Sequence, residues 1–101
     1  MSEINADHIL KSFREEIDRL DQEIVKLIAE RFEVVHQVGE TKAKHNLSPV
    51  QPRRMTEVLD RVSALASSHN LDADMVRDLY TRMIDHAHTL EYDIIGEEPD
   101  K

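Results

Sequence analysis

The stretch HILKSFREEIDRLDQEIVKLIAERFEVVHQVGETKAK, residues 8–44, decides the fold. Its side chains on one face recur at alternating steps of three and four residues, at Leu10, Phe13, Ile17, Leu20, Ile24, Leu27, Arg31, Val34, Val38 and Thr41. This alternation predicts a single long helix with an apolar seam of the kind found in coiled coils. Arg31 interrupts the seam at a position where an apolar residue is expected.

The predicted helix is too long to be covered by the rest of its own chain. Roughly 37 residues at 1.5 Å per residue make a rod of about 55 Å. A globular domain of about 100 residues has a radius of gyration near 13 Å. We therefore expect the seam to need a partner, and the simplest partner is a second copy of the chain in a homodimer.

Composition points to one all-α domain, residues 1–101, with its core at about 8–95. The chain is 40% hydrophobic, 34% charged and only 4% aromatic, with two Gly and three Pro, which favours long helices around an aliphatic core. A net charge of −8 argues against nucleic acid as a partner. The absence of cysteine, of a signal-peptide pattern and of a long apolar run predicts a cytoplasmic protein without a membrane span.

Two further helices are expected after the long one, a short one and then a medium one. The segment NLSPVQP, residues 46–52, breaks the first helix, and Pro52 suits the first turn of the second. The second helix has an apolar face and ends near 67–70; its apolar residues are Met55, Val58, Leu59, Val62, Leu65 and Ala66.

Asn5 or Asp7 could cap the first helix, and Asp72 is the expected cap of the third. Gly96 and Pro99 should end the third helix. The residues expected to face inward from it are Val76, Leu79 or Tyr80, Met83, Ala87, Leu90 and Ile94.

Arg31 is the first candidate for a functional residue. A guanidinium on an apolar seam is unfavourable unless it is paired or meets an anionic ligand. Lys42 lies about three turns and about 16 Å further along nearly the same face. Two cations at this separation could hold the two ends of a small dianion. A buried ion pair at Arg31 and a solvated helix-end charge at Lys42 are the alternatives.

Two more arginines could complete such a site. Arg54 opens the second helix and could fold back over the first, whereas its neighbour Arg53 must point elsewhere. Arg14 lies about 26 Å before Arg31 on the helix, too far to share a small ligand with it in one chain. In an antiparallel pair of chains, Arg14 of one could approach the pocket of the other. An exposed salt bridge to Asp18 is the alternative.

Glu91 lies on the same predicted face as Met83, Ala87 and Ile94. A carboxyl group there would be partly removed from water and could donate a hydrogen bond as the neutral acid. The alternative is a boundary residue that faces solvent.

Metal and cofactor chemistry is not expected. No two of the six histidines form an HxxxH pair; they are His8, His36, His45, His69, His86 and His88. The sequence also has no nucleophile motif, glycine-rich phosphate loop or dinucleotide fingerprint. We therefore expect neither a metal nor a cofactor.

An ordered set of segments resembles a known family. REEIDRLDQEIVKLIAER (14–31), VGETKAK (38–44) and PVQPRRMTEVL (49–59) are similar to the AroQ class of chorismate mutases, and the resemblance covers about residues 10–95. It implies a small all-helical enzyme that forms an intertwined homodimer with two active sites. It also implies an isomerase of aromatic amino acid biosynthesis that rearranges the dianion chorismate to prephenate without a cofactor.

The resemblance implies a role for each matching residue. Arg14 from the partner chain and Arg31 would bind the two carboxylates, with Arg54 adding a further contact. Lys42 and protonated Glu91, where the family has Gln or in some branches Glu, would donate hydrogen bonds to the breaking ether oxygen. Arg31, Lys42 and Glu91 are thus the expected catalytic residues. The full substrate-binding set comprises Arg14, Arg31, Lys42, Gln51, Arg54, Met55, Ala87 and Glu91.

Gln51 and Met55 depart from the family pattern. Many members have acidic residues at these positions, near the ring hydroxyl of the substrate. The segment PVQPRRM is closer to the isochorismate pyruvate lyases of salicylate biosynthesis, and an amino-deoxychorismate mutase is a further alternative. A non-catalytic helical dimerisation or regulatory module would explain the seam but not the aligned cations.

Overall fold

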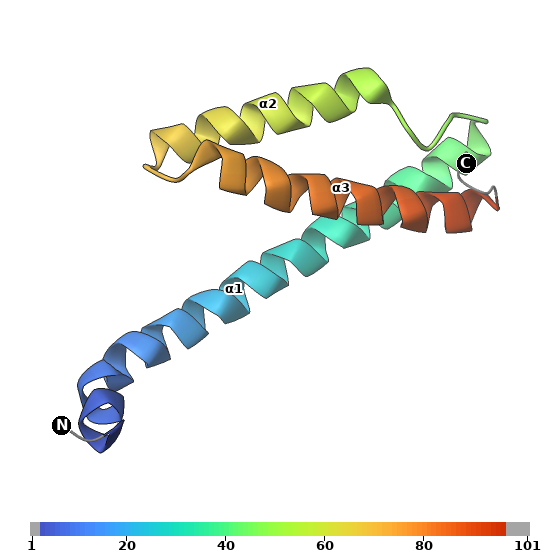
Figure 1. The fold of residues 1–101 in the computed structure, drawn as a ribbon. Coiled ribbons are helices and arrows are strands. Elements are labelled where there is room, and N and C mark those ends of the chain that lie inside the picture. The colour runs from blue at the N-terminus through green and yellow to red at the C-terminus, as the bar shows by residue number, and fades with distance from the viewer. Residues whose placement is uncertain (1–2, 97–101) are drawn as a thin grey trace. The chain divides into compact units, whose positions relative to one another are not determined.

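A computed structural model of the chain describes residues 3–96 and shows three helices. They are α1 (Glu3–Lys44), α2 (Pro52–Ser68) and α3 (Ala73–Ile95) (Figure 1). Their lengths are 42, 17 and 23 residues, and residues 3–96 contain no strand. This confirms the predicted all-α class with one very long, one short and one medium helix.

The chain divides into two compact units, Met1–Glu33 and Val34–Lys101. The described part of the first unit is the N-terminal three-quarters of α1. The second unit contains the last turns of α1 together with α2 and α3.

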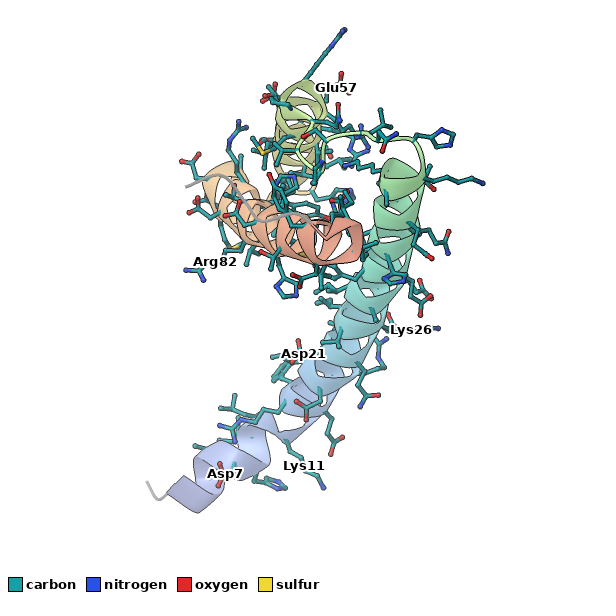
Figure 2. All side chains as sticks on the ribbon, turned by 90° about the vertical axis from the view of Figure 1, so that its right-hand side faces the viewer. Asp7, Lys11, Asp21, Lys26, Glu57 and Arg82 are labelled. Carbon is teal, nitrogen blue, oxygen red and sulfur yellow. The ribbon has the colours of Figure 1, made fainter. Side chains whose placement is uncertain are left out.

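In the first unit, the apolar seam is open to solvent. The exposed fractions of Phe13, Ile24 and Leu27 are 64%, 54% and 63%. Figure 2 shows the charged side chains of Lys11 and Asp21 projecting from the same segment. The alternation of apolar residues therefore gives a helix, as predicted, and the seam residues of this unit are exposed in the described part of the chain.

The start of α1 corrects one prediction. The helix begins at Glu3, so Asn5 and Asp7 lie inside it and neither can be its N-cap. The Asp7 carboxylate instead accepts a hydrogen bond from Arg14 Nη1 at 2.8 Å.

In the second unit, α2 and α3 run antiparallel and lie side by side (Figure 1). Val58, Val62 and Ile84 form the buried cluster between them; the partly buried residues packed against it are Met55, Leu59, Val76 and Tyr80. Tyr80 therefore takes the inward position for which Leu79 was the other candidate.

Two details of the predicted core are different in the structure. Leu65, expected on the apolar face of α2, is 51% exposed, and Ile84 of α3, which was not expected to face inward, is only 7% exposed. The helical period allows more than one apolar stripe, and packing of α3 against α2 selects the stripe that contains Val76, Tyr80 and Ile84.

Helix ends follow the expected local chemistry. Pro52 is the first residue of α2, after Gln51 in an extended conformation. Asp72 caps α3 by accepting a hydrogen bond from the Met75 amide at 3.1 Å. Gly96 ends α3 with a φ of 82°, a left-handed conformation that glycine adopts without strain. Pro99, the other expected stop signal, lies outside the described residues.

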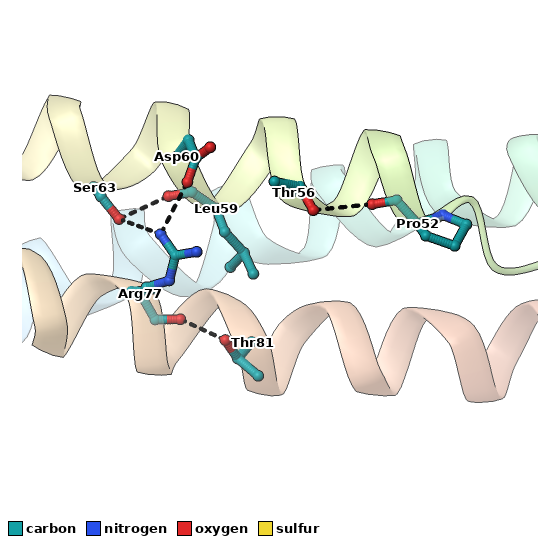
Figure 3. A network of polar contacts seen from close by, with 7 residues as sticks. All are labelled: Pro52, Thr56, Leu59, Asp60, Ser63, Arg77 and Thr81. Atoms are coloured by element: carbon teal, nitrogen blue, oxygen red, sulfur yellow. Dashed lines mark hydrogen bonds and ion pairs between the residues drawn. The ribbon is translucent and has the colours of Figure 1, made fainter.

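A polar network joins α2 to α3 on the solvent side of their core (Figure 3). Arg77 Nη1 donates to Asp60 Oδ1 and to Ser63 Oγ, at 3.2 Å in both cases. The Ser63 hydroxyl in turn donates to the Leu59 carbonyl at 2.7 Å. The network links the middle of α2 to the first turns of α3, alongside their buried core.

Candidate active site

Lys42 occupies the last turn of α1 and is largely buried, with 14% of its side chain exposed. Its Nζ donates a hydrogen bond to the Pro49 carbonyl at 2.6 Å. Pro49 lies in the loop between α1 and α2 and is fully buried. The loop therefore folds back on the lysine and restricts the directions in which its ammonium group can point.

Glu91 of α3 faces the same ammonium group. Lys42 Nζ lies 2.6 Å from Glu91 Oε1, and only 6% of the Glu91 side chain is exposed. Opposite charges attract strongly where water is excluded, so the short contact between these two buried groups is an ion pair.

Ala87 lies one helical turn before Glu91 and is 6% exposed. Both residues belong to the buried face of α3.

The other predicted residues of the second unit lie at the start of α2. Arg54 is exposed, and its Nη1 is 3.6 Å from Glu57 Oε2. Gln51 is exposed and donates from Nε2 to the Ser48 carbonyl at 2.9 Å. Met55 is half-buried against the α2–α3 core. Arg54 and Gln51 thus make local contacts, whereas Met55 contributes to the core between α2 and α3.

Arg14 and Arg31 belong to the first unit. Arg14 is about half exposed and pairs with Asp7, rather than with Asp18 as the alternative interpretation had it. Arg31 is half-buried and engaged in an interaction. Their expected roles in substrate binding stay predictions.

Sequence reasoning missed two contributors to the surroundings of Lys42. The Pro49 carbonyl is a backbone group, so the residue type gives no signal for it. Gly39 packs against Glu91, and here a signal existed, because it is the one glycine in the 42 residues of α1.

A separate pocket of about 460 Å³ lies between the α1–α2 loop and α3. Its lining includes Ser48 and Val50 from the loop, Pro52 at the start of α2, and Asp85, His88 and Tyr92 from α3. None of the predicted site residues lines it.

The described residues give two further findings. Within residues 3–96, no group of three or more His, Cys, Asp or Glu side chains is arranged to hold a metal ion. No helix in this part of the chain is long and apolar enough to cross a membrane.

Comparison with known families gives a match over most of the chain. Residues 13–92 match the family described as chorismate mutase type II. The chorismate mutase of Methanocaldococcus jannaschii is 30% identical over 92 residues, which cover 91% of this chain and 93% of that protein.

Two other relatives differ in length or in name. The T-protein of Haemophilus influenzae is 35% identical over 82 residues, but the match covers only 22% of its length and 81% of this chain. The 4-amino-4-deoxychorismate mutase of Streptomyces venezuelae is 29% identical over 75 residues, 74% of this chain and 73% of that protein.

These matches confirm the AroQ resemblance and the predicted enzyme class, an isomerase of the chorismate mutase type. The match spans all three helices and includes Lys42 and Glu91. The chain belongs to the type II chorismate mutase family.

Proposed function

We propose that the chain rearranges chorismate to prephenate, without a cofactor, in a cationic pocket shared between two chains. The observation that carries the proposal is the buried pair formed by Lys42 and Glu91, which places an ammonium and a carboxyl group 2.6 Å apart. Membership of the family supplies the substrate class, a dianionic enol ether.

The reaction is a unimolecular [3,3] rearrangement and needs no nucleophile. Catalysis must come from holding the compact chair conformer and from stabilising negative charge on the breaking ether oxygen. Lys42 is suited to the second task because an ammonium group has three N–H donors. One is donated to the Pro49 carbonyl, which leaves two for Glu91 and the substrate.

Glu91 is the proposed second donor to the ether oxygen. Its buried Oε1 lies 2.6 Å from the Lys42 ammonium nitrogen, so both proposed donors converge on one place. As the neutral acid, its carboxyl group would carry the proton that such a hydrogen bond requires.

Arginines supply the proposed contacts to the two substrate carboxylates. Arg31 and Arg54 would come from the same chain, and Arg14 would come from the partner. Each guanidinium can grip a carboxylate with two parallel hydrogen bonds. The exposed ion pairs of Arg14 with Asp7 and of Arg54 with Glu57 are weak enough to exchange for such contacts.

The proposed partner is a second copy of the chain, packed through the α1 seam. This is supported by the exposure of the seam residues, which are 39–64% exposed; they are Leu10, Phe13, Ile17, Leu20, Ile24 and Leu27. A contiguous apolar stripe of this kind marks an interaction surface. An antiparallel pairing would bring Arg14 to the site of the other chain.

A second candidate function depends on which substituent of the substrate ring the site recognises. Gln51 and Met55 offer no carboxylate for a ring hydroxyl. The relative named 4-amino-4-deoxychorismate mutase favours a mutase of the amino-substituted substrate as the alternative. Isochorismate pyruvate lyase stays a further alternative on the sequence pattern alone.

A product assay tests the proposal. Purified protein receives chorismate, isochorismate or 4-amino-4-deoxychorismate in separate reactions without added cofactor, and NMR identifies the products. Prephenate from chorismate, well above the uncatalysed rate, is the expected result. Turnover of only the amino-substituted compound would establish the second candidate. Salicylate and pyruvate from isochorismate would establish the lyase.

A matched pair of variants separates catalysis from contamination. Lys42→Ala should abolish most turnover, whereas Lys44→Ala removes an exposed lysine from the same final turn and should not. If the wild-type protein turns over none of the three compounds, a non-catalytic helical module becomes the better interpretation.

A further inference from the structure

Gly39 is a point of close contact between α1 and α3. A Cβ atom at this position would lie 2.9 Å from Ile94 Cδ1, 3.4 Å from Glu91 Cγ and 3.6 Å from Glu91 Cα. Gly39 itself is buried. The two helices therefore approach each other here more closely than most side chains would allow.

The backbone conformation does not require glycine at position 39. Gly96 has a positive φ, whereas Gly39 lies in ordinary helical backbone. Glycine is also among the poorest helix formers, so a long helix has reason to avoid it. Space, rather than conformation, explains this residue.

Gly39 and Lys42 face the same residue of α3. They are three positions apart and therefore lie on one face of α1. Gly39 lies against Cα and Cγ of Glu91, and Lys42 Nζ is 2.6 Å from its Oε1. The distance between α1 and the Glu91 backbone therefore determines whether Lys42 Nζ can reach the Glu91 carboxyl group.

We propose that Gly39 is a positioning residue, whose missing side chain sets the approach of α1 to α3 and thereby holds the Lys42 ammonium at the Glu91 carboxyl group. The catalytic consequence rests on the proposed function. The geometric consequence does not, because the ion pair is a contact between two residues of the chain itself.

The contacts predict a graded response to side-chain size. In Gly39→Ala, the shortest contact is with Ile94 Cδ1, the end of a flexible side chain, which can turn away. Glu91 Cγ then has to shift by a few tenths of an ångström. In Gly39→Val, the added methyl groups extend beyond a Cβ that is already 3.6 Å from the Glu91 backbone. Relief then requires α1 and α3 to move apart.

The first readout is independent of catalysis. Urea unfolding of the wild type, Lys42→Met, Glu91→Gln and the double variant forms a double-mutant cycle. It gives the coupling free energy between the two side chains. The same cycle is then measured in the presence of Gly39→Ala and of Gly39→Val. We expect coupling to weaken with alanine and to be lost with valine.

The second readout is steady-state kinetics with chorismate. We expect kcat to fall by about 10²-fold in Gly39→Val, because misplacement by about 1 Å has an effect of this size, while KM changes little. Gly39→Ala should show a smaller loss. Adding Ile94→Val, which removes Cδ1, should restore part of the loss in Gly39→Ala. Ile94→Val alone is the baseline, and Gln37→Ala, on an exposed position of α1, is the control.

The outcomes are distinguishable. Weakened coupling supports the proposal even if wild-type protein fails to turn over chorismate, in which case only the proposed function is lost. If the coupling between Lys42 and Glu91 is unchanged in Gly39→Val, the positioning role of Gly39 is overturned, whatever the kinetics show. If Gly39→Val does not fold, Gly39→Ala decides in the same way, with unchanged coupling and no rescue by Ile94→Val counting against the proposal.

Discussion

Lys42 Nζ lies 2.6 Å from Glu91 Oε1, with only 14% and 6% of the two side chains exposed. Each charge is out of water and is compensated mainly by the other. The pair joins the end of α1 to α3, across 49 positions of sequence, at the place where family resemblance expects substrate. Stability and the proposed catalysis therefore depend on the same contact.

Removal of Lys42 should harm both stability and activity. In Lys42→Ala, Glu91 is left as an uncompensated buried charge, and breaking a buried pair in this way costs about 3–5 kcal/mol. Urea unfolding should show a loss of this order, and adding Glu91→Gln should recover part of it. Turnover of chorismate should fall by at least about 10² because the donor to the ether oxygen is lost. Equal behaviour of Lys42→Ala and Lys44→Ala would contradict the assignment.

Glu91 should act as a hydrogen-bond donor to the ether oxygen. In Glu91→Gln the side-chain amide keeps a donor at the same position, whereas Glu91→Ala removes it. Glu91→Gln should therefore retain most of the turnover of chorismate, and turnover by Glu91→Ala should fall by about 10². Steady-state kinetics of the two purified variants measure the difference, and equal losses would refute this role.

Most of the fold could be predicted because its signals are local. Alternating apolar steps indicate α1, two prolines and Asp72 place the helix boundaries, and Gly96 ends α3. The stripe that α3 buries could not be chosen from periodicity alone. Leu79 and Tyr80 fit the period equally well, and the choice depends on how α2 packs against α3.

The candidate site could be predicted only as a set of residues. Lys42 and Glu91 can be predicted from their helix positions and from the family pattern, but the contact between them depends on how α1 and α3 pack. The Pro49 carbonyl that binds Lys42 is a backbone group, which any residue in that loop could supply. Such contacts arise from tertiary packing and cannot be predicted from composition or residue spacing.

Arg31 is expected to anchor a substrate carboxylate. Arg31→Ala should lower kcat/KM for chorismate by at least about 10², the loss typical of a positioned charged donor. Arg19→Ala is the matched control, because Arg19 is an exposed arginine of α1 that pairs with Glu23 at 3.3 Å. Near wild-type turnover by purified Arg31→Ala would remove this residue from the site.

The seam of α1 should form the contact between two chains. Ile24 lies on the seam and is 54% exposed, whereas its neighbour Val25 lies off it and is 64% exposed. Ile24→Glu places a charge where an apolar surface would be buried, so analytical ultracentrifugation should show monomers. Val25→Glu should remain a dimer. If both variants sediment alike, the contact between chains does not use the seam.

Arg14 should act in the site of the partner chain, and mixed dimers can test this. Arg14→Ala and Lys42→Ala should each be nearly inactive alone. When equal amounts are unfolded and refolded together, half of the dimers are mixed. If Arg14 crosses the interface, each mixed dimer has one site with both defects and one intact site, so about a quarter of wild-type activity should return. If Arg14 served its own chain, every site would keep one defect and the mixture would stay inactive.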